Sequence, residues 1–572
     1  MPELSFKDRA RTVYRRFQRG RRDASTIVRA PVAEWSQRKF SSDQLLIVPQ
    51  ELRTADPSLI ADIRSGYFGL GGATVELEGR SPFMVKPPTK AWLEALHGFA
   101  WLSDLRADGG KQSLEFARQS VTDWIEGQVV DDGPAWRPEI MARRVMAFLG
   151  NSGFLLEHAD QKLYDLFATS LMKQLKLLAR GAPRAPAGLP RLTAETAIVM
   201  AGLCMADLES VLDRHLPIFL AELEKQVLKD GGHVSRNEAL LVEILLDCLP
   251  LKQCFVARSR EIPKPLNLAI QRMLGMLRHM QLPDGSLARF NGVSATPLDR
   301  LAAVLAFDEA AHRPGLGALT PSRYPKIQRR RLVLIADCGS PPTGDLAATA
   351  QAGCLSFEVC SGDQMLIVNA GWPGAADLAR SDDARGTAAQ STLVLSNTPS
   401  ARLIRRKSRG EGQMISGISG PARVEAKVEE REDGSVALLS EHNGYFEQFG
   451  KLHSRTLQLS PQGDRLEGID RIWQPTVLAS TTHRNLSFSI HFHLPPSASA
   501  TRGPEPQTSD ILLPGGERWR MLVQGAQIGI EESTHFARAT GPTQSAQIVL
   551  RGVAVEDTEV RWRLMRLKDG MA

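Results

Sequence analysis

The chain has 572 residues, a formal net charge of +6 and an ordinary apolar fraction of 42%. This length allows two domains with sizeable cores. No apolar run approaches the roughly 20 residues that a transmembrane helix needs, so no integral membrane segment is expected. The positive charge permits an acidic partner without identifying one.

The N-terminus is basic, with arginines at positions 9, 11, 15, 16, 19, 21 and 22, and no hydrophobic run follows them. A secretory signal is therefore not visible. We expect a solvated arm; binding to an anionic polysaccharide, a membrane surface or nucleic acid is the alternative. The six cysteines show neither a CxxC motif nor a zinc-type spacing, which favours buried, reduced thiols.

The first half of the chain has helical periodicity from about residue 87, after a short hairpin expected near residues 68–77. Helices are expected near residues 113–125, 138–149, 160–178, 193–204, 208–228, 239–249 and 265–280. Successive helices without intervening strands predict an α-helical domain built from hairpins. Because no fixed-period repeat is evident, a closed (α/α) toroid is favoured over a superhelical array.

After residue 326 the pattern changes to short runs rich in Val, Ile and Leu, separated by polar turns. Strands are expected near residues 331–336, 354–360, 364–369, 391–395, 454–459, 465–470, 487–493, 518–523, 527–531, 546–553 and 559–567. So many strands predict a large antiparallel β-sandwich. The predicted domains are a basic lead-in and mixed segment (1–85), the toroid (86–325) and the sandwich (326–572).

A polar stretch, residues 230–238, comes directly before a strongly apolar helix. Ser235 and Glu238 have the spacing of a helix capping box. Capping does not explain His233, Arg236 and Asn237, which lie within five residues of one another. The stretch is therefore either a helix start or one wall of a functional cleft.

A helical toroid followed by a sandwich, with a polar helix start between them, resembles the heparinase II/III family of polysaccharide lyases. The motifs that carry the resemblance are residues 96–102, 230–237, 353–358 and 384–392. The resemblance implies β-elimination on a heparin- or heparan-like polysaccharide that contains uronic acids. A hydrogen bond that neutralises the uronate carboxylate makes the adjacent C5 proton acidic. A base then removes this proton, and an acid protonates the departing C4 oxygen.

By this resemblance Asn237 neutralises the carboxylate, with His233 or Arg236 beside it. Arg236 could equally bind a sulfate or a second carboxylate. The chain departs from the family pattern because it has no tyrosine between residues 237 and 323, where Phe290 and Asn291 stand instead. This departure leaves the acid and base of the reaction unassigned.

The sandwich also departs from the family, with Gln351 and Gln390 where histidine is usual and Asn369 where some members carry aspartate. Amides are poor zinc ligands, so no metal and no other cofactor is expected. Gln351, Gln390 and Arg385 are candidate substrate-binding residues. The alternative for the amides is that they are ordinary polar residues at strand ends.

The segment from His442 to Tyr445 contains Asn-Gly, which predicts a two-residue hairpin turn. His442 and Tyr445 would then face each other and could supply base and acid. An ordinary polar hairpin is the alternative. Trp101 is the candidate for stacking on a sugar ring, although tryptophans at helical spacing are more often core residues.

The first functional hypothesis is a metal-independent lyase. The second is a non-catalytic protein that binds an anionic glycan of the cell envelope. The second hypothesis is favoured by Gln351, Gln390 and Phe290. A glycoside hydrolase would need two facing carboxylates, such as Glu238 and Asp284. No nucleic-acid-binding motif is present. The resemblance implies that the protein is located in the cell envelope or periplasm, but because no secretory signal is visible, a cytoplasmic location is the alternative. The oligomeric state is not predicted.

Overall fold

The computed structural model describes residues 44–127, 133–308, 320–374, 380–408, 412–475 and 485–567. The chain divides into two compact units. The first unit contains Met1–Glu222 and Asp247–Ile262, and the second contains Leu223–Leu246 and Pro263–Ala572. The basic arm at residues 9–22 lies outside the described residues. The domain boundaries at residues 85 and 325 stay predictions.

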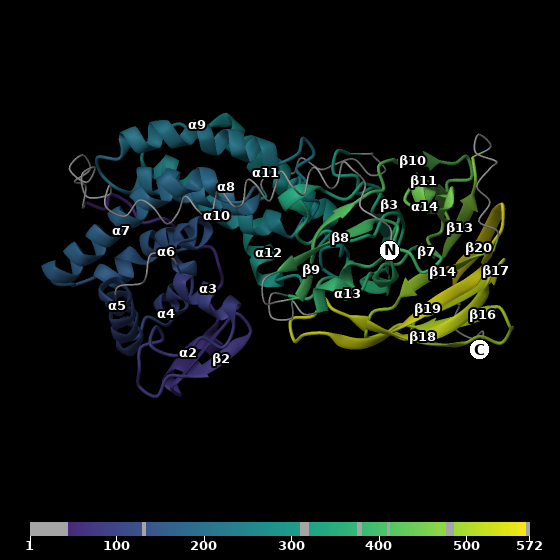
Figure 1. The fold of residues 1–572 in the computed structure, drawn as a ribbon, viewed down its shortest axis with the longest axis horizontal. Helices are drawn as coiled ribbons and strands as arrows, with labels where there is room; N and C mark the ends of the chain where they lie inside the picture. Colours follow the sequence, from purple (N-terminus) through teal and green to yellow (C-terminus); the bar gives the residue numbers. More distant parts are fainter. Residues whose placement is uncertain are drawn as a thin grey trace. The chain divides into compact units, whose positions relative to one another are not determined.

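The first unit is helical apart from one small hairpin (Figure 1). Its elements are α2 (Pro57–Arg64), β1 (Tyr67–Leu70), β2 (Ala73–Glu76), α3 (Lys90–Gly98), α4 (Leu102–Asp108), α5 (Lys111–Glu126), α6 (Pro138–Leu156), α7 (Gln161–Gly181) and α8 (Leu189–Cys204). Two further helices, α9 (Glu209–Gln226) and α10 (Leu240–Ala257), belong partly to each unit. The expected hairpin and the expected succession of helices are confirmed.

Burial explains how these helices are arranged. Every residue of α8 from Leu192 to Cys204 is buried, as is typical of a helix that is apolar on all sides. Helix α6 packs against α3, α7 and α8. Helix α7 is amphipathic and begins at Asp160, whose carboxylate accepts the N–H of Leu163 at 2.8 Å. A buried helix packed against amphipathic neighbours fits the inner and outer helices of the expected (α/α) toroid.

The second unit contains α11 (Lys264–Met280), α12 (Leu298–Leu305) and three larger antiparallel sheets (Figure 1). The largest has the order β10-β11-β12-β13-β20-β17-β16-β15, and the other two have the orders β18-β19-β14-β7 and β3-β4-β5-β6. The bounds are β3 (Lys326–Arg329), β4 (Leu332–Ala336), β5 (Phe357–Ser361), β6 (Gln364–Ile367), β7 (Leu393–Leu395), β8 (Arg402–Ser408), β9 (Gly412–Ser419), β10 (Val424–Glu430), β11 (Val436–His442), β12 (Leu452–Leu459), β13 (Arg465–Trp473), β14 (Leu486–His493), β15 (Ser499–Arg502), β16 (Thr508–Leu512), β17 (Arg518–Gln524), β18 (Gln527–His535), β19 (Thr543–Ala554) and β20 (Asp557–Arg566). Strands β8 and β9 form a separate hairpin.

The sandwich core follows from alternation along the strands. In β20 the buried residues are Val560, Trp562 and Leu564, so every second side chain faces inward. The Trp562 ring stacks on Phe357 with a centroid distance of 5.9 Å. On the neighbouring strand β13, Gly468 lies opposite Trp562, and a Cβ at Gly468 would come within 2.0 Å of the indole. The expected antiparallel β-sandwich is confirmed.

The hairpin predicted at residues 443–444 is wrong. Strands β11 and β12 are joined by residues 443–451, which contain the short helix α14 (Phe446–Phe449). His442 pairs with His453 across the ladder, and not with Tyr445. The Tyr445 hydroxyl instead donates to the Leu393 carbonyl at 2.6 Å, so a buried tertiary contact overrides the local turn preference.

No helix within the described segments has both the length and the apolarity needed to cross a membrane.

Candidate functional site

The loop between α9 and α10 carries the polar stretch and is held tightly within the second unit. Gly231 has φ +94°, and a Cβ there would lie 1.9 Å from the Arg272 carbonyl oxygen, so only glycine fits. The Asp230 carboxylate accepts the Gly232 N–H at 3.2 Å, and it accepts the N–H and the hydroxyl of Ser322 at 2.9 and 2.6 Å. The backbone of this loop is therefore fixed from both sides.

His233 is fully buried in this loop. Its Nδ1 accepts the N–H of Ser235 at 3.1 Å and lies 2.6 Å from the Ser235 hydroxyl. Its Nε2 lies 3.2 Å from the Gln226 side-chain oxygen, which assigns the proton to Nε2. Burial lowers the pKa of His233 to about 4, so the imidazole is neutral near pH 7. Both ring nitrogens are already committed to neighbours.

Glu238 does not form the expected capping box with Ser235. Its Oε2 accepts the N–H of His233 at 2.9 Å, and its Oε1 has no hydrogen-bond partner in the described part of the chain. Helix α10 begins two residues later, at Leu240. Burial raises the pKa of Glu238 to about 8, and the nearby Asp230 carboxylate adds to the increase. The carboxyl group of Glu238 thus links the end of this loop to the backbone of His233.

Arg236 is buried with φ +60°, and its guanidinium is surrounded by acceptors. Its Nε donates to the Ser322 carbonyl at 3.1 Å, and its Nη1 donates to the Gly339 carbonyl at 3.0 Å. Its Nη2 donates to Asp337 Oδ1 at 2.6 Å. Burial is the largest single influence and would lower the pKa of Arg236, but Asp337, Tyr324 and Cys354 together outweigh it and raise the pKa above its usual value. Arg236 is a permanent structural cation.

Three further residues complete what we call the Arg236 cluster, namely Asp337, Asn291 and Tyr324. Asn291 Nδ2 lies 2.8 Å from the Tyr324 hydroxyl and 3.0 Å from Asp337 Oδ2. The Tyr324 hydroxyl donates to the Arg236 carbonyl at 2.6 Å, and its ring lies 4.5 Å from the guanidinium carbon. Asp337 is not among the residues expected from the sequence. The available signal is an aspartate placed directly after the fully buried strand β4.

Asn237 lies beside this cluster and is also buried. Its Oδ1 accepts the N–H of Ala239 at 3.2 Å, which is a helix-start contact. Its Nδ2 donates to the Thr349 hydroxyl at 3.2 Å. The amide has two N–H donors, and within the described residues Thr349 accepts one of them. Asn237 therefore keeps one donor available for another partner.

The three amides of the sandwich are committed to the backbone. Gln351 Oε1 accepts the Gly292 N–H at 3.1 Å, and its Nε2 donates to the Gly371 and Ala384 carbonyls at 3.1 and 2.8 Å. Gln390 Nε2 also donates to the Ala384 carbonyl, at 3.0 Å.

Asn369 accepts the Ser391 N–H at 2.8 Å. All three amides are at most 2% exposed. In the described part of the chain, no three His, Cys, Asp or Glu side chains are grouped so that they could hold a metal ion.

The other two candidate substrate-binding residues differ from each other. Trp101 is 2% exposed, donates to the Leu96 carbonyl at 3.1 Å and stacks on Phe99, so its ring belongs to the core of the first unit. Arg385 is also buried and lies 5.3 Å from the Trp372 ring. Its Nε and Nη1 have no hydrogen-bond partner in the described structure.

His442 belongs to a buried charge network inside the sandwich. Its Nε2 lies 3.2 Å from His453 Nδ1, and His453 Nε2 lies 2.8 Å from Asp470. Arg455 also binds Asp470, at 2.7 Å. Burial lowers the pKa of His442, and the neighbouring His453 and Arg455 lower it further. His442 and Tyr445 are each 1% exposed, so the loop-tip position expected for an acid and base pair is not formed.

Taken together, most candidate side chains are buried and hydrogen-bonded within the protein. His233, Arg236, Asn237, Gln351 and Gln390 are all less than 10% exposed. A general base must reach the proton that it removes, and His233 has both nitrogens occupied. The geometry is that of a structural support.

Comparison with known proteins identifies the family. The model of the heparinase II/III-like C-terminal domain matches residues 312–563. FtsZ-localized protein C from Caulobacter vibrioides (strain NA1000 / CB15N) is 31% identical over 535 residues, which cover 91% of this chain and 89% of that protein. The chain belongs to the heparinase II/III family.

Solved structures of this family share the fold. A mutant of the heparan sulfate lyase HepC from Pedobacter heparinus has a TM-score of 0.64 at 15% identity, covering 92% of this chain and 87% of that one. A structure of heparinase III has a TM-score of 0.66 at 12% identity, covering 87% of this chain and 80% of that one. The resemblance first seen in the motifs is thus confirmed, as is the fold of a toroid followed by a sandwich.

Proposed function

We propose that this heparinase II/III family member is a non-catalytic protein of the cell-division apparatus that localises with FtsZ. The observation that carries the proposal is the saturation of the candidate catalytic groups, above all the two occupied nitrogens of His233. The relative from Caulobacter vibrioides supports the choice of partner, because its name records localisation with FtsZ and the similarity spans 91% of this chain.

A polysaccharide lyase is the second candidate, and Asn237 is the observation that favours it. This amide stands at the position that the family resemblance assigns to carboxylate neutralisation, and it keeps one N–H donor. Against it, the sequence lacks the family tyrosine, and His442 and Tyr445 are buried away from any substrate. An amide without a base can bind a uronate, but it cannot complete the elimination.

An elimination assay separates the two candidates. The purified chain is incubated with heparin, heparan sulfate, chondroitin, hyaluronan, alginate and polygalacturonate, with an active heparinase III as the positive control. We expect no rise in ultraviolet absorbance, because no unsaturated uronate forms. A rise that disappears in Asn237→Ala would overturn the non-catalytic proposal and establish the lyase.

Co-sedimentation tests the partner. FtsZ from the same organism is polymerised with GTP and pelleted in the presence of the purified chain. We expect the chain to enter the pellet in proportion to polymer, and to stay in the supernatant when GDP replaces GTP. A chain that stays soluble with FtsZ polymers would remove direct FtsZ association from the proposal.

A further inference from the structure

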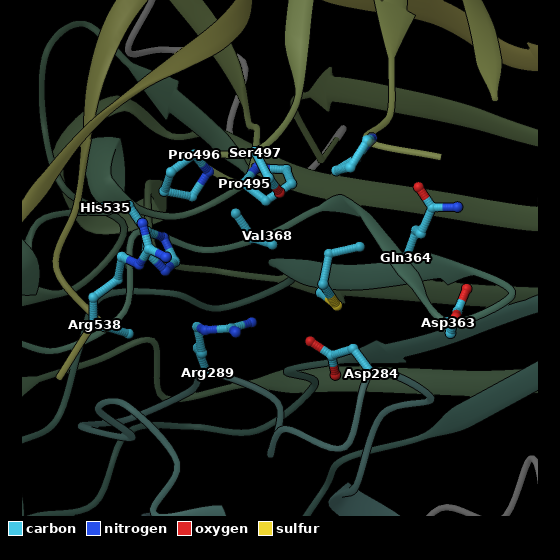
Figure 2. Close-up of a pocket in the computed structure, with 13 residues that line it drawn as sticks. Asp284, Arg289, Asp363, Gln364, Val368, Pro495, Pro496, Ser497, His535 and Arg538 are labelled. Atoms are coloured by element: carbon cyan, nitrogen blue, oxygen red, sulfur yellow. The ribbon is translucent and has the colours of Figure 1, made fainter. Parts of the chain in front are cut away.

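A second polar region of the second unit lies in a pocket of about 300 Å³ that none of the family comparisons assigns (Figure 2). Its walls come from the loop after α11, the β5–β6 hairpin and the segments after β14 and β18. The charged or polar residues that line it include Asp284, Arg289, Asp363, Gln364, His535 and Arg538. We call it the His535 pocket. Its volume is at the lower end of the range for small-molecule sites.

Two arginines and one histidine form the cationic side of the His535 pocket. Arg289 is half-buried and is oriented by the buried Glu358, whose Oε2 accepts its backbone N–H at 3.0 Å and lies 3.4 Å from its Nη1. Arg538 is exposed, and no side-chain partner is recorded for it within the described residues. Arg289 Nη2 also donates to the Ser286 hydroxyl at 3.4 Å, so Arg289 offers an incoming oxyanion only its remaining N–H donors, whereas Arg538 can offer its full guanidinium.

His535 lies between these groups and is only 4% exposed. Its Nδ1 has no hydrogen-bond partner in the described part of the protein. Burial lowers the pKa of His535 to about 3, and Arg289, His493 and Arg538 contribute. The ring is therefore neutral and offers a hydrogen bond without a charge. Because buried polar atoms are nearly always paired, this ring nitrogen is a hydrogen-bonding group that the described protein atoms leave unused at the pocket wall.

The opposite side of the pocket is acidic. Figure 2 shows Asp284 and Asp363 on one side, and Arg289, His535 and Arg538 on the other. Pro495, Pro496 and Pro514 line the space as well. A long polyanion would gain from the arginines but would be repelled by the two carboxylates. A small molecule with opposite charges at its two ends gains from both sides.

We propose that the His535 pocket binds a small zwitterion, an amino acid or short peptide, and that it does so independently of FtsZ. The ligand carboxylate lies against Arg289, His535 and Arg538, and the ligand ammonium faces Asp284 and Asp363. The side chain of the ligand packs on the proline wall.

Calorimetric titration of the full chain with three matched dipeptides tests this proposal. The first probe is alanyl-alanine, which carries both charges. The second is its C-terminal amide, which lacks the carboxylate, and the third is its N-acetyl derivative, which lacks the ammonium. We expect the zwitterion to bind about tenfold or more tightly than either analogue, because each loses a charge-assisted contact. Equal affinities for the three, or no binding by any, would overturn the proposal.

Variants of two exposed residues test which end of the ligand each side of the pocket binds. Arg538→Gln should weaken binding of alanyl-alanine and of its N-acetyl form but leave the amide unchanged. Asp363→Asn should weaken alanyl-alanine and the amide but leave the N-acetyl form unchanged. The proposal is overturned if neither variant discriminates, or if inorganic sulfate or heparin binds in an Arg538-dependent manner while the dipeptides do not.

Discussion

The Arg236 cluster and the His535 pocket are both polar, but they differ in how their polar atoms are satisfied. In the cluster, every nitrogen of the Arg236 guanidinium has an acceptor, and in the adjoining loop both nitrogens of His233 have partners. In the pocket, His535 Nδ1 is orphaned and Arg538 extends into solvent. Polar residue types alone therefore do not distinguish a structural cluster from a binding site. An unsatisfied polar atom that lines a pocket, together with exposed charges around it, does so better.

The largest effect on stability is expected when Arg236 loses its charge partner Asp337. Asp337→Asn leaves a buried guanidinium without its charge partner, which costs about 3–5 kcal/mol in the free energy of unfolding. Denaturant unfolding measures the loss. The matched control is Arg471→Gln, because Arg471 pairs with Asp557 on the surface and such pairs contribute about 1 kcal/mol or less. Equal losses in the two variants would show that the cluster is not structural.

Comparing the two histidines tests the same difference with one residue type. His233→Ala removes the hydrogen bonds that the two ring nitrogens make with Gln226 and Ser235, which costs about 2 kcal/mol or more. His535→Ala leaves no protein atom newly unpaired at Nδ1, so we expect less than half of that loss. Thermal denaturation of both variants is the measurement. A larger effect at His535 would contradict a ligand-binding role for its free nitrogen.

Glu238 gives a pH-dependent test. Its pKa of about 8 in the folded protein is above the roughly 4.3 of an unfolded glutamate, so the folded state holds the proton between these values. Stability from this group is therefore present at low pH and is lost as the pH rises toward 8. Glu238→Gln should stabilise the protein at pH 8 by about 1 kcal/mol or more relative to pH 5, seen as a flatter pH profile. If the dependence of stability on pH is the same in Glu238→Gln as in the unaltered protein, Glu238 is not the group that holds this proton.

The smallest effect is expected in the pocket. Arg538→Gln removes an exposed side chain for which no partner is recorded within the described residues, so stability should change by about 0.5 kcal/mol or less. The same unfolding experiment detects it. A loss comparable to that of Asp337→Asn would mean that Arg538 supports the fold.

The fold could be predicted because hydrophobic periodicity is a local signal. The fully buried helix α8 and the alternating strand β20 are visible in the sequence as an apolar segment and a period of two. Strand β10, Val424–Glu430, was missed because it carries four charged residues and has no fully buried one. Local patterns thus predicted many core elements but not all of them, since the largely buried strands β11 and β16 inside the same sheet were not expected either.

The candidate site was less predictable because burial and partners are set by distant residues. Asp337 lies 101 positions from Arg236, and nothing local in residues 230–238 indicates that pair. Tyr445 was misplaced because its anchor, Leu393, lies 52 positions away. The pocket was not predicted at all, since Arg289 and His535, the last residue of β18, lie far apart in the sequence.

The loop of residues 230–238 has a consequence for dissecting this protein by truncation. The second unit is discontinuous, since it needs Leu223–Leu246 in addition to the chain from Pro263 onward. A fragment that begins at residue 263 would contain the whole β-sandwich, yet the buried Asp337 would lose the Arg236 guanidinium that pairs with it, and the Tyr324 hydroxyl would lose its acceptor, the Arg236 carbonyl. A sandwich fragment is therefore expected to be soluble only if residues 223–246 are supplied in trans or fused back by a linker.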